Sequence, residues 1–289
     1  MEFRTLQYFL AVVRESNISR AAEALHITQP TLSRQMTQLE EELGVQLFVR
    51  GKYLSLTDAG VMLRRRAEEV SALMGKIESE FDEHAEIGGV ISIGSGGLTA
   101  LNFLSLAMER FRKKYPGIQY QLYNNSAEYV KERLEQGLLD FGVLMEPVDV
   151  TKFEYIRMRE KERWGLLIQS HHPLAEKERI LKTDLYNIPL IVPERLSIQK
   201  ELETWLGEDF SGMDIFAGCN MIPHVSMLVE RGTAFALTVE GAVSQFDKNR
   251  MVFRPLYPEL SMTSVLAWKK FQPNFGAAGK FLDYLKSMC

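Results

Sequence analysis

Apolar side chains near the start of the chain recur with the period of an α-helix. One set is spaced i, i+3, i+4 and i+7: Leu6, Phe9, Leu10 and Val13. A later set forms a second stripe: Leu32, Met36, Leu39 and Leu43. Such spacing places each set on one face of an amphipathic helix. Between the two sets, Ala21 and Ala22 stand beside Leu25 and predict a short helix whose small side chains let backbones approach closely.

The predicted third helix has a marked start and a polar outer face. Thr28 is its expected N-cap, and Pro30 falls in the first turn, where no amide proton is missed. Opposite the apolar stripe lie Pro30, Thr31, Arg34, Gln38 and Glu41, with Ser33 and Thr37 on the flanks. Two short helices joined by a tight turn, the second polar on its outer face, place one helix in the major groove of DNA.

Two of these side chains have the chemistry to recognise bases. Arg34 can bridge guanine O6 and N7, and Gln38 can pair with adenine. The same pattern also fits a solvated polar face on an ordinary three-helix domain. The helices alone therefore leave both interpretations open.

The following segment favours the DNA interpretation. Residues 44–57 have the pattern of a β-hairpin whose tip carries the two cations Arg50 and Lys52. Such a wing beside a recognition helix would contact the phosphates that flank the groove. Thr57 then caps a long helix that begins at Asp58, with an acidic residue in its first turn.

This long helix carries a narrow apolar seam. Its members are spaced 4, 3, 4, 3 and 4 residues apart: Leu63, Ala67, Val70, Met74, Ile77 and Phe81. Such a seam is typical of a helix that pairs with a second helix. The alternative is a helix packed on its own domain, but the other faces are heavily charged. We therefore expect the seam to form a dimer contact.

At this point the chain resembles a known family, the LysR-type transcriptional regulators. The resemblance rests on an ordered series of matches: SRAAEAL at 19–25, TQPTLSRQ at 28–35, LE at 39–40, LG at 43–44, LF at 47–48, Arg50, and LTDAG at 56–60. It implies a winged helix-turn-helix, a linker helix that pairs two subunits, and a C-terminal inducer-binding domain. By position, it assigns DNA contacts to Gln29, Pro30, Ser33 and Arg34, and the wing to Arg50.

Residue chemistry and resemblance together give one predicted DNA-contacting set: Gln29, Pro30, Thr31, Ser33, Arg34, Gln38, Arg50 and Lys52. One departure from the family is the wing tip at residues 51–54, where relatives often carry further cations. We therefore expect weaker phosphate contact from this wing.

Net charge by itself does not indicate DNA binding. The chain has 34 Lys and Arg residues against 38 Asp and Glu residues. Phosphate neutralisation depends on where charges lie. Acidic residues cluster at 40–42 and along the linker helix, whereas Arg34, Arg50 and Lys52 lie at the expected contact edge. Modest electrostatic affinity per domain favours binding as a dimer or tetramer, in which several recognition helices add their contacts.

Length and composition limit the class of protein further. A chain of 289 residues with 46% hydrophobic content is long enough for two or three domains. No apolar run approaches the roughly 18 residues of a membrane span, and the start of the chain is amphipathic instead of having the pattern of a signal peptide. Only Cys219 and Cys289 occur, so a disulfide scaffold is excluded and a reducing cytoplasm is expected.

The remaining two thirds of the chain alternate strand and helix patterns. Expected strands lie at 90–94, 118–123, 141–145, 164–169, 190–192, 214–217, 234–239 and 264–268. Expected helices lie at 98–114, 128–136, 198–206, 225–230 and 277–288. This order predicts two α/β units with parallel sheets, similar to the periplasmic-binding-protein-like effector domain that the resemblance implies.

The predicted fold class is thus α/β, with an N-terminal winged helix-turn-helix, a long linker helix and a two-lobed effector domain. The expected domains are 1–57, 58–87 and 88–289. Within the last, we expect lobe I at 88–162 and 268–289, and lobe II at 163–267.

Ligands in such sheets bind at the carboxyl ends of the strands. Loops that lead into helix N-termini there offer unpaired amide protons to an anion. The predicted effector-binding residues are Ser95, Gly97, Leu98, Thr99, Ser126, Met145, Ser197, Ile198, Cys219 and Asn220. They favour a small anionic or carboxylated effector. For Thr99 and Ser197, helix capping remains an equal alternative.

Other chemistry fits the sequence less well. The loop at residues 94–99 has neither the third glycine of a dinucleotide fingerprint nor the Lys-Ser/Thr ending of a P-loop. His171 and His172 lack a second ligand pair, and Cys219 with His224 lacks a third residue to orient the imidazole. We expect no metal, no cofactor and no enzymatic activity. The alternative is a two-lobed enzyme or ligand-binding protein with a helical appendage.

Overall fold

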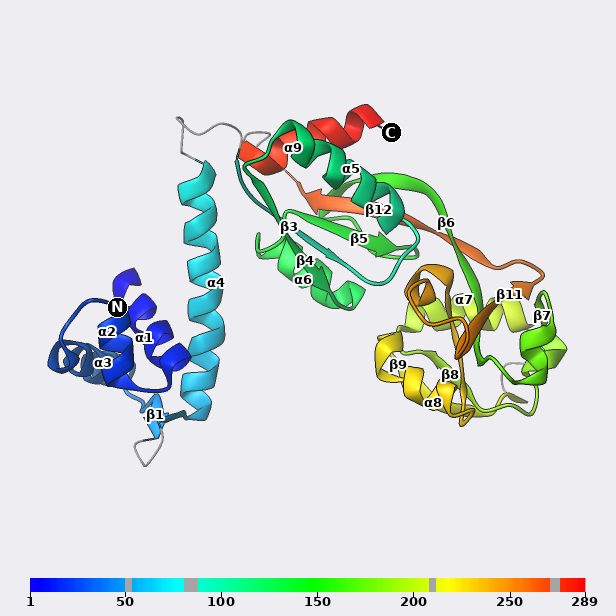
Figure 1. The fold of residues 1–289 in the computed structure, drawn as a ribbon, viewed down its shortest axis with the longest axis horizontal. Helices are drawn as coiled ribbons and strands as arrows, with labels where there is room; N and C mark the ends of the chain where they lie inside the picture. Colours follow the sequence, from blue (N-terminus) through cyan, green and yellow to red (C-terminus); the bar gives the residue numbers. More distant parts are fainter. Residues whose placement is uncertain (50–53, 81–87, 208–211, 271–275, 289) are drawn as a thin grey trace. The chain divides into compact units, whose positions relative to one another are not determined.

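The computed structural model describes residues 1–49, 54–80, 88–207, 212–270 and 276–288 (Figure 1). The chain divides into two compact units, Met1–Phe81 and Asp82–Cys289, which are described separately below. Within the described ranges, no helix combines the length and apolar character needed to cross a lipid bilayer.

The first unit contains the predicted helices and hairpin: α1 (Phe3–Glu15), α2 (Ile18–Ala24), α3 (Gln29–Leu43), β1 (Phe48–Val49), β2 (Ser55–Leu56) and α4 (Asp58–Glu80). Thr28 caps α3 as predicted, because its Oγ1 accepts the amide proton of Thr31 at 3.4 Å. Pro30 lies in the first turn. Gly44 ends the helix in the left-handed conformation, with φ of 68°.

Most of the predicted apolar stripe of α3 is buried. Leu32, Met36 and Leu39 are at most 1% exposed and pack into one core with Phe9 and Leu47. Leu43 was predicted to belong to this stripe, and that prediction is wrong because its side chain is 39% exposed. It is the last residue of the helix, where the chain turns away at the following glycine.

The hairpin is attached to α3 by a half-buried polar contact. The carboxylate of Glu40 accepts the backbone amides of Leu47 at 2.7 Å and Phe48 at 3.2 Å. A carboxylate that holds two amides at the start of β1 fixes the wing relative to α3. The wing tip, with Arg50 and Lys52, lies outside the described residues.

The two ends of α4 have different surroundings. Ala67 is fully buried in the core of the first unit, and Leu63 packs against the same core. Val70, Leu73 and Ile77 are 37–49% exposed. The start of the predicted seam thus packs on its own domain, as the alternative interpretation had it, and only the later part is open to another chain. Phe81 lies outside the described residues.

The second unit is built on a 10-stranded sheet. Its strands are β3 (Gly89–Ser95), β4 (Ile118–Asn124), β5 (Phe141–Met145), β6 (Phe153–Gln169), β7 (Ile180–Leu181), β8 (Leu190–Pro193), β9 (Ile215–Cys219), β10 (Phe235–Val239), β11 (Met251–Tyr257) and β12 (Ser261–Lys269). Its α-helices are α5 (Leu101–Lys114), α6 (Ala127–Glu135), α7 (Leu196–Leu206), α8 (Ser226–Glu230) and α9 (Gly276–Met288).

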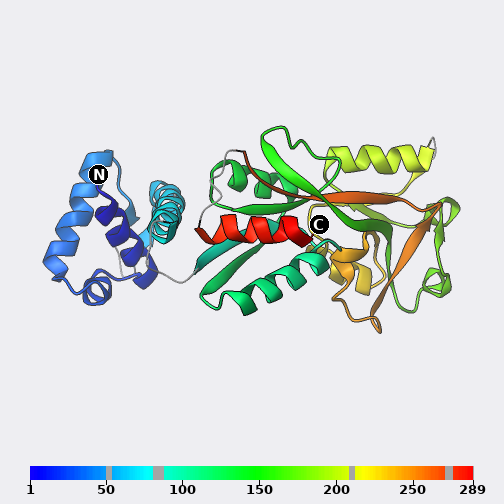
Figure 2. The same ribbon diagram turned by 90° about the horizontal axis from the view of Figure 1, so that it is seen from above.

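Two groups of parallel strands define two lobes within this unit. In the first lobe, β3 pairs in parallel with β4 and β5, and in the second, β8 pairs in parallel with β9 and β10. Helices α5 and α9 cover one face of the first group, and α6 covers the other (Figures 1 and 2). This arrangement confirms the predicted α/β fold class.

Antiparallel strands β6 and β12 connect the lobes. The first part of β6 pairs with β12, and its last part, from Trp164, pairs with β10 and β11. Strand β12 also pairs with β5 over residues 264–267. The predicted strand at 164–169 was too short, since β6 begins at Phe153. The exact lobe boundaries at 162/163 and 267/268 stay a prediction.

A glycine at the start of α4 offers a test of how the wing is packed. A Cβ on Gly60 would lie 2.2 Å from the backbone oxygen of Leu47, whereas a Cβ on Gly75 meets nothing within 4 Å. We expect Gly60→Ala to destabilise the protein by about 1–3 kcal/mol through overpacking. Gly75→Ala is the control and should stabilise it by about 0.5–1 kcal/mol. Urea unfolding of both variants decides the point, and equal stability would contradict this packing.

Candidate functional site

The polar face of α3 is open in the structure. Gln29, Pro30, Thr31, Arg34 and Gln38 are exposed, and Ser33 is half-buried. Gln38 Nε2 donates to Glu42 Oε1 at 3.3 Å. The helix is held from behind by its buried stripe and from its end by the wing, so this face is presented on a rigid support. DNA contact by these side chains stays a prediction.

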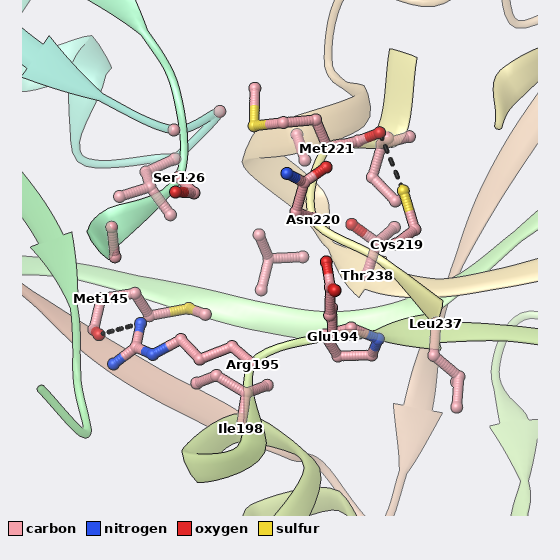
Figure 3. A pocket seen from close by; sticks show the side chains of 18 of the residues that line it. Ser126, Met145, Glu194, Arg195, Ile198, Cys219, Asn220, Met221, Leu237 and Thr238 are labelled. Carbon is pink, nitrogen blue, oxygen red and sulfur yellow. Dashed lines mark hydrogen bonds between the residues drawn. The ribbon is translucent and has the colours of Figure 1, made fainter. Parts of the chain in front are cut away.

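The second unit contains a cavity of about 690 Å³ (Figure 3). Its walls come from the carboxyl ends of parallel strands in both lobes, as predicted for this type of sheet. Eight of the predicted effector-binding residues lie in its walls: Gly97, Leu98, Ser126, Met145, Ser197, Ile198, Cys219 and Asn220. Ligand contact by these residues stays a prediction.

Ser95 and Thr99 do not lie in the walls. Ser95 is the buried last residue of β3, and Thr99 precedes α5 with its Oγ1 buried and without a hydrogen-bond partner in the described structure. The walls also contain Glu194, Arg195 and Met221, which belong to the same predicted loops as Ser197 and Cys219 but were not in the predicted binding set. Sequence reasoning missed Trp164, Leu237 and Thr238. Trp164 and Leu237 lie on β6 and β10, and only the sheet order brings them beside the predicted loops.

The amides that were expected to bind an anion before α5 already have a partner. The carboxylate of Glu162, on β6, accepts the backbone amides of Thr99 at 2.7 Å and Ala100 at 3.1 Å. Its side chain is fully buried and also accepts the hydroxyl of Ser264, on β12, at 3.1 Å. The loop before α5 is therefore held by an internal anion, and these two donors are not free for an effector.

Two glycines allow the lobes to approach each other closely at this loop. A Cβ on Gly97 would lie 2.8 Å from the Cα of Ala242, and one on Gly241 would lie 2.2 Å from the backbone nitrogen of Thr99. Gly241 and Ala242 belong to a short 3₁₀ turn (Glu240–Val243) after β10. The glycine-rich character of the loop thus serves contact between the lobes.

Arg195 lines the cavity, and its side chain extends from the second lobe to the first (Figure 3). It precedes α7 in the second lobe, and its Nη1 donates to the backbone oxygen of Met145 at 3.0 Å. Its Nη2 donates to the backbone oxygen of Pro147, and its Nε donates to Ser197 Oγ at 3.0 Å. Burial lowers the pKa of the guanidinium, against the opposing effect of Glu128.

Helix capping was the alternative role for Thr99 and Ser197, but neither side chain caps a helix. The N-cap of α5 is Ala100 and that of α7 is Arg195, in both cases without a side-chain capping bond. Ser197 Oγ instead donates to the backbone oxygen of Pro147 at 3.3 Å. Ser197 therefore takes part in the same contact between lobes as Arg195.

Cys219 and the histidine pair have structural surroundings. Cys219 Sγ donates to the backbone oxygen of Met221 at 2.9 Å, and burial raises the pKa of this thiol, which disfavours the nucleophilic thiolate. The ring of His172 packs on Phe235 at 4.7 Å, and its Nδ1 accepts the amide of Leu174. Across the described ranges, no group of three or more His, Cys, Asp or Glu residues is placed to hold a metal ion.

Comparison with known proteins identifies the family. Residues 3–61 match the family described as "Bacterial regulatory helix-turn-helix protein, lysR family", and residues 84–289 match "LysR substrate binding domain". The HTH-type transcriptional regulator AlsR of Bacillus subtilis (strain 168) is 34% identical over 247 residues, covering 84% of this chain and 78% of AlsR. The Hca operon transcriptional activator HcaR of Escherichia coli (strain K12) is 29% identical over 282 residues, covering 93% of this chain and 92% of HcaR.

Solved structures agree with the fold. CbnR, a LysR family transcriptional regulator, superposes with a TM-score of 0.76 at 22% identity and covers 99% of both chains. Full-length CbnR in complex with its target DNA gives a TM-score of 0.75 at 20% identity.

The fold and the family matches define the class of this protein. It is a transcriptional regulator that combines a helix-turn-helix with an effector domain. The chain belongs to the LysR family. It is a DNA-binding regulator under effector control, and the relatives named above are regulators, not enzymes. The enzyme alternative therefore finds no support.

Removal of the Glu162 carboxylate tests its structural role. Glu162→Ala leaves two backbone amides without their acceptor, and we expect a loss of about 3 kcal/mol of unfolding free energy. Glu178→Ala, at an exposed position, is the control and should change the unfolding free energy by less than about 0.5 kcal/mol. Chemical denaturation measures both. A Glu162→Ala protein as stable as the control would show that these bonds contribute nothing.

Proposed function

We propose that α3 reads operator DNA through its exposed polar face. The supporting observation is the exposure of Gln29, Thr31, Arg34 and Gln38 on a helix that Thr28 caps and a buried stripe holds. CbnR, whose fold this chain shares, has been solved in complex with its target DNA. Footprinting the protein on DNA upstream of its own gene tests the proposal. Absence of any preference over random competitor would overturn it.

Arg34 is the side chain with the clearest expected role at the DNA. If it bridges guanine O6 and N7, Arg34→Ala should cost about 1–3 kcal/mol of binding free energy on the preferred site and relax the preference at one base pair. Fluorescence anisotropy on the footprinted fragment and its single-base variants measures this. Arg14→Ala, an exposed residue of α1, is the control. Equal weakening on every sequence would assign Arg34 to a phosphate.

We further propose that a small molecule binds in the cavity between the lobes and controls the regulator there. The cavity has the size of a metabolite site, and most of its wall is apolar with a few polar groups. An effector that binds one arrangement of the lobes more tightly shifts the equilibrium toward it. In a dimer, this shift changes the spacing of the two DNA-binding heads and the bend imposed on DNA. We place the regulator in the cytoplasm, where such DNA lies.

The exposed part of α4 is the proposed dimer contact. Val70, Leu73 and Ile77 are spaced 3 and 4 residues apart, so they share one face, and all three are exposed within the first unit. An exposed apolar stripe on a charged helix is typical of a surface that pairs with a second helix.

Charges on this face should separate the subunits. We expect Val70→Asp combined with Ile77→Asp to lower the sedimentation coefficient from that of an oligomer to that of a monomer, because two carboxylates would face two others across the contact. Val45→Asp, an exposed apolar position after α3, is the control and should leave it unchanged. A sedimentation profile that the double variant leaves unaltered would exclude α4 as the contact.

A further inference from the structure

The Arg195 guanidinium is a charge with an unusual set of partners. Its side chain is only 17% exposed, and the acceptors at Met145, Pro147 and Ser197 are all neutral. Among the described residues, its ion-pair partner is Glu128, whose carboxylate is 3.7 Å from Nε and 67% exposed. A desolvated guanidinium gains most from a direct, bidentate carboxylate, which Glu128 does not supply at this distance.

The acceptors of Arg195 are held firmly by the first lobe. Met145 is the last residue of β5, and Pro147 lies in the loop that follows. Glu146, between them, donates its amide to the backbone oxygen of Thr263, on β12, at 2.8 Å. The carboxylate of Glu146 pairs with Arg157, on β6, at 3.0 Å, which keeps the pKa of this carboxyl low. The bonds of Arg195 therefore connect the second lobe to a fixed point on the first.

No other cation lines the cavity, among the residues the structure describes. Glu128 and Glu194 also lie in the wall, and Glu162 occupies the amides before α5. Within the described wall, Arg195 is therefore the group that attracts an anionic group of an effector, and the neighbouring Glu128 carboxylate, 3.7 Å from its Nε, competes for the guanidinium. The N-terminus of α7 begins at this residue and adds its partial positive charge.

We propose that Arg195 is a carboxylate-binding latch: it ties the two lobes together through the Met145 and Pro147 oxygens, and a carboxylate of the effector takes these donors over. A carboxylate is the stronger acceptor because its hydrogen bonds to guanidinium are charge-assisted on both sides. Effector binding and release of the contact between lobes are then one event. This inference rests on the proposed effector function of the cavity, and it adds the residue that recognises the carboxylate and the coupling of that recognition to the contact between the lobes.

The latch is tested first without any effector. Nitroxide labels are attached to noncanonical residues at positions 132 and 203, which are exposed sites on α6 and α7. Double electron–electron resonance then measures the distance between the lobes. The sample is full-length protein diluted with unlabelled chain. Arg195→Ala should broaden the distance distribution and shift it to longer values. Arg179→Ala is the matched control, because this arginine stacks on Tyr257 at 4.3 Å, away from the cavity. An unchanged distribution in Arg195→Ala overturns the latch.

Carboxylate recognition is tested with a fixed set of straight-chain and aromatic carboxylates of four to ten carbons, each paired with its primary amide. We expect at least one carboxylate to bind wild-type protein at least tenfold more tightly than its amide, by calorimetry, and to shift the wild-type distances toward those of Arg195→Ala. Arg195→Ala should lose at least tenfold in affinity, and Glu128→Gln should gain because a competing carboxylate is removed. The proposal is overturned if no carboxylate binds, if binding survives in Arg195→Ala, or if it shortens the distances.

Failure of the proposed function gives a different result. Selection of promoter DNA by the wild-type protein is measured without carboxylates. If the protein selects no promoter DNA, the regulator function is overturned, and the distance and affinity results on Arg195 stand independently. If the wild-type protein selects promoter DNA but Arg195→Ala changes neither the distance between the lobes nor the carboxylate affinity, only the latch is overturned.

Discussion

The buried carboxylate of Glu162 is the contact on which the arrangement of the second unit depends. It lies on β6, accepts two amides from the loop before α5, and accepts the hydroxyl of Ser264 on β12. A fully buried anion is tolerated only where hydrogen bonds replace its hydration, so these three elements are held in one geometry. Because β6 and β12 are also the strands that pass between the lobes, the same side chain fixes one wall of the cavity and the connection across it.

This contact changes how the cavity recognises charge. The amides of Thr99 and Ala100 serve Glu162, and the glycines at 97 and 241 serve the close approach of the lobes. In the proposed recognition of an effector carboxylate, the donor is instead Arg195, which precedes α7 in the second lobe. Among the described residues of the wall, Arg195 is the cation that contacts both lobes, and the carboxylate of Glu128 lies 3.7 Å from its Nε.

The first unit uses the same principle of fixing an exposed surface from behind. Glu40 attaches the wing to α3, and Leu32, Met36 and Leu39 hold the helix to the core. The exposed polar face of α3 is thus supported from behind by the core and at its end by the wing. On α4, buried and exposed apolar residues lie at different positions along the helix, since Ala67 belongs to the core and Ile77 is exposed.

The sequence by itself determined the helices and hairpin of the first unit, the Thr28 cap of α3 and most strands and helices of the second unit, but neither β7 nor β11. These depend on side chains a few residues apart, such as Thr28 with Thr31, and helical spacing encodes them directly. Only the tertiary structure decided which hydrogen-bond donors remain available to a ligand. Thr99 and Glu162 are 63 residues apart and Arg195 and Met145 are 50 apart, and the sheet order brings each pair together. Sequence pattern shows which donors a loop contains, but only the packed fold determines which acceptor has already taken them.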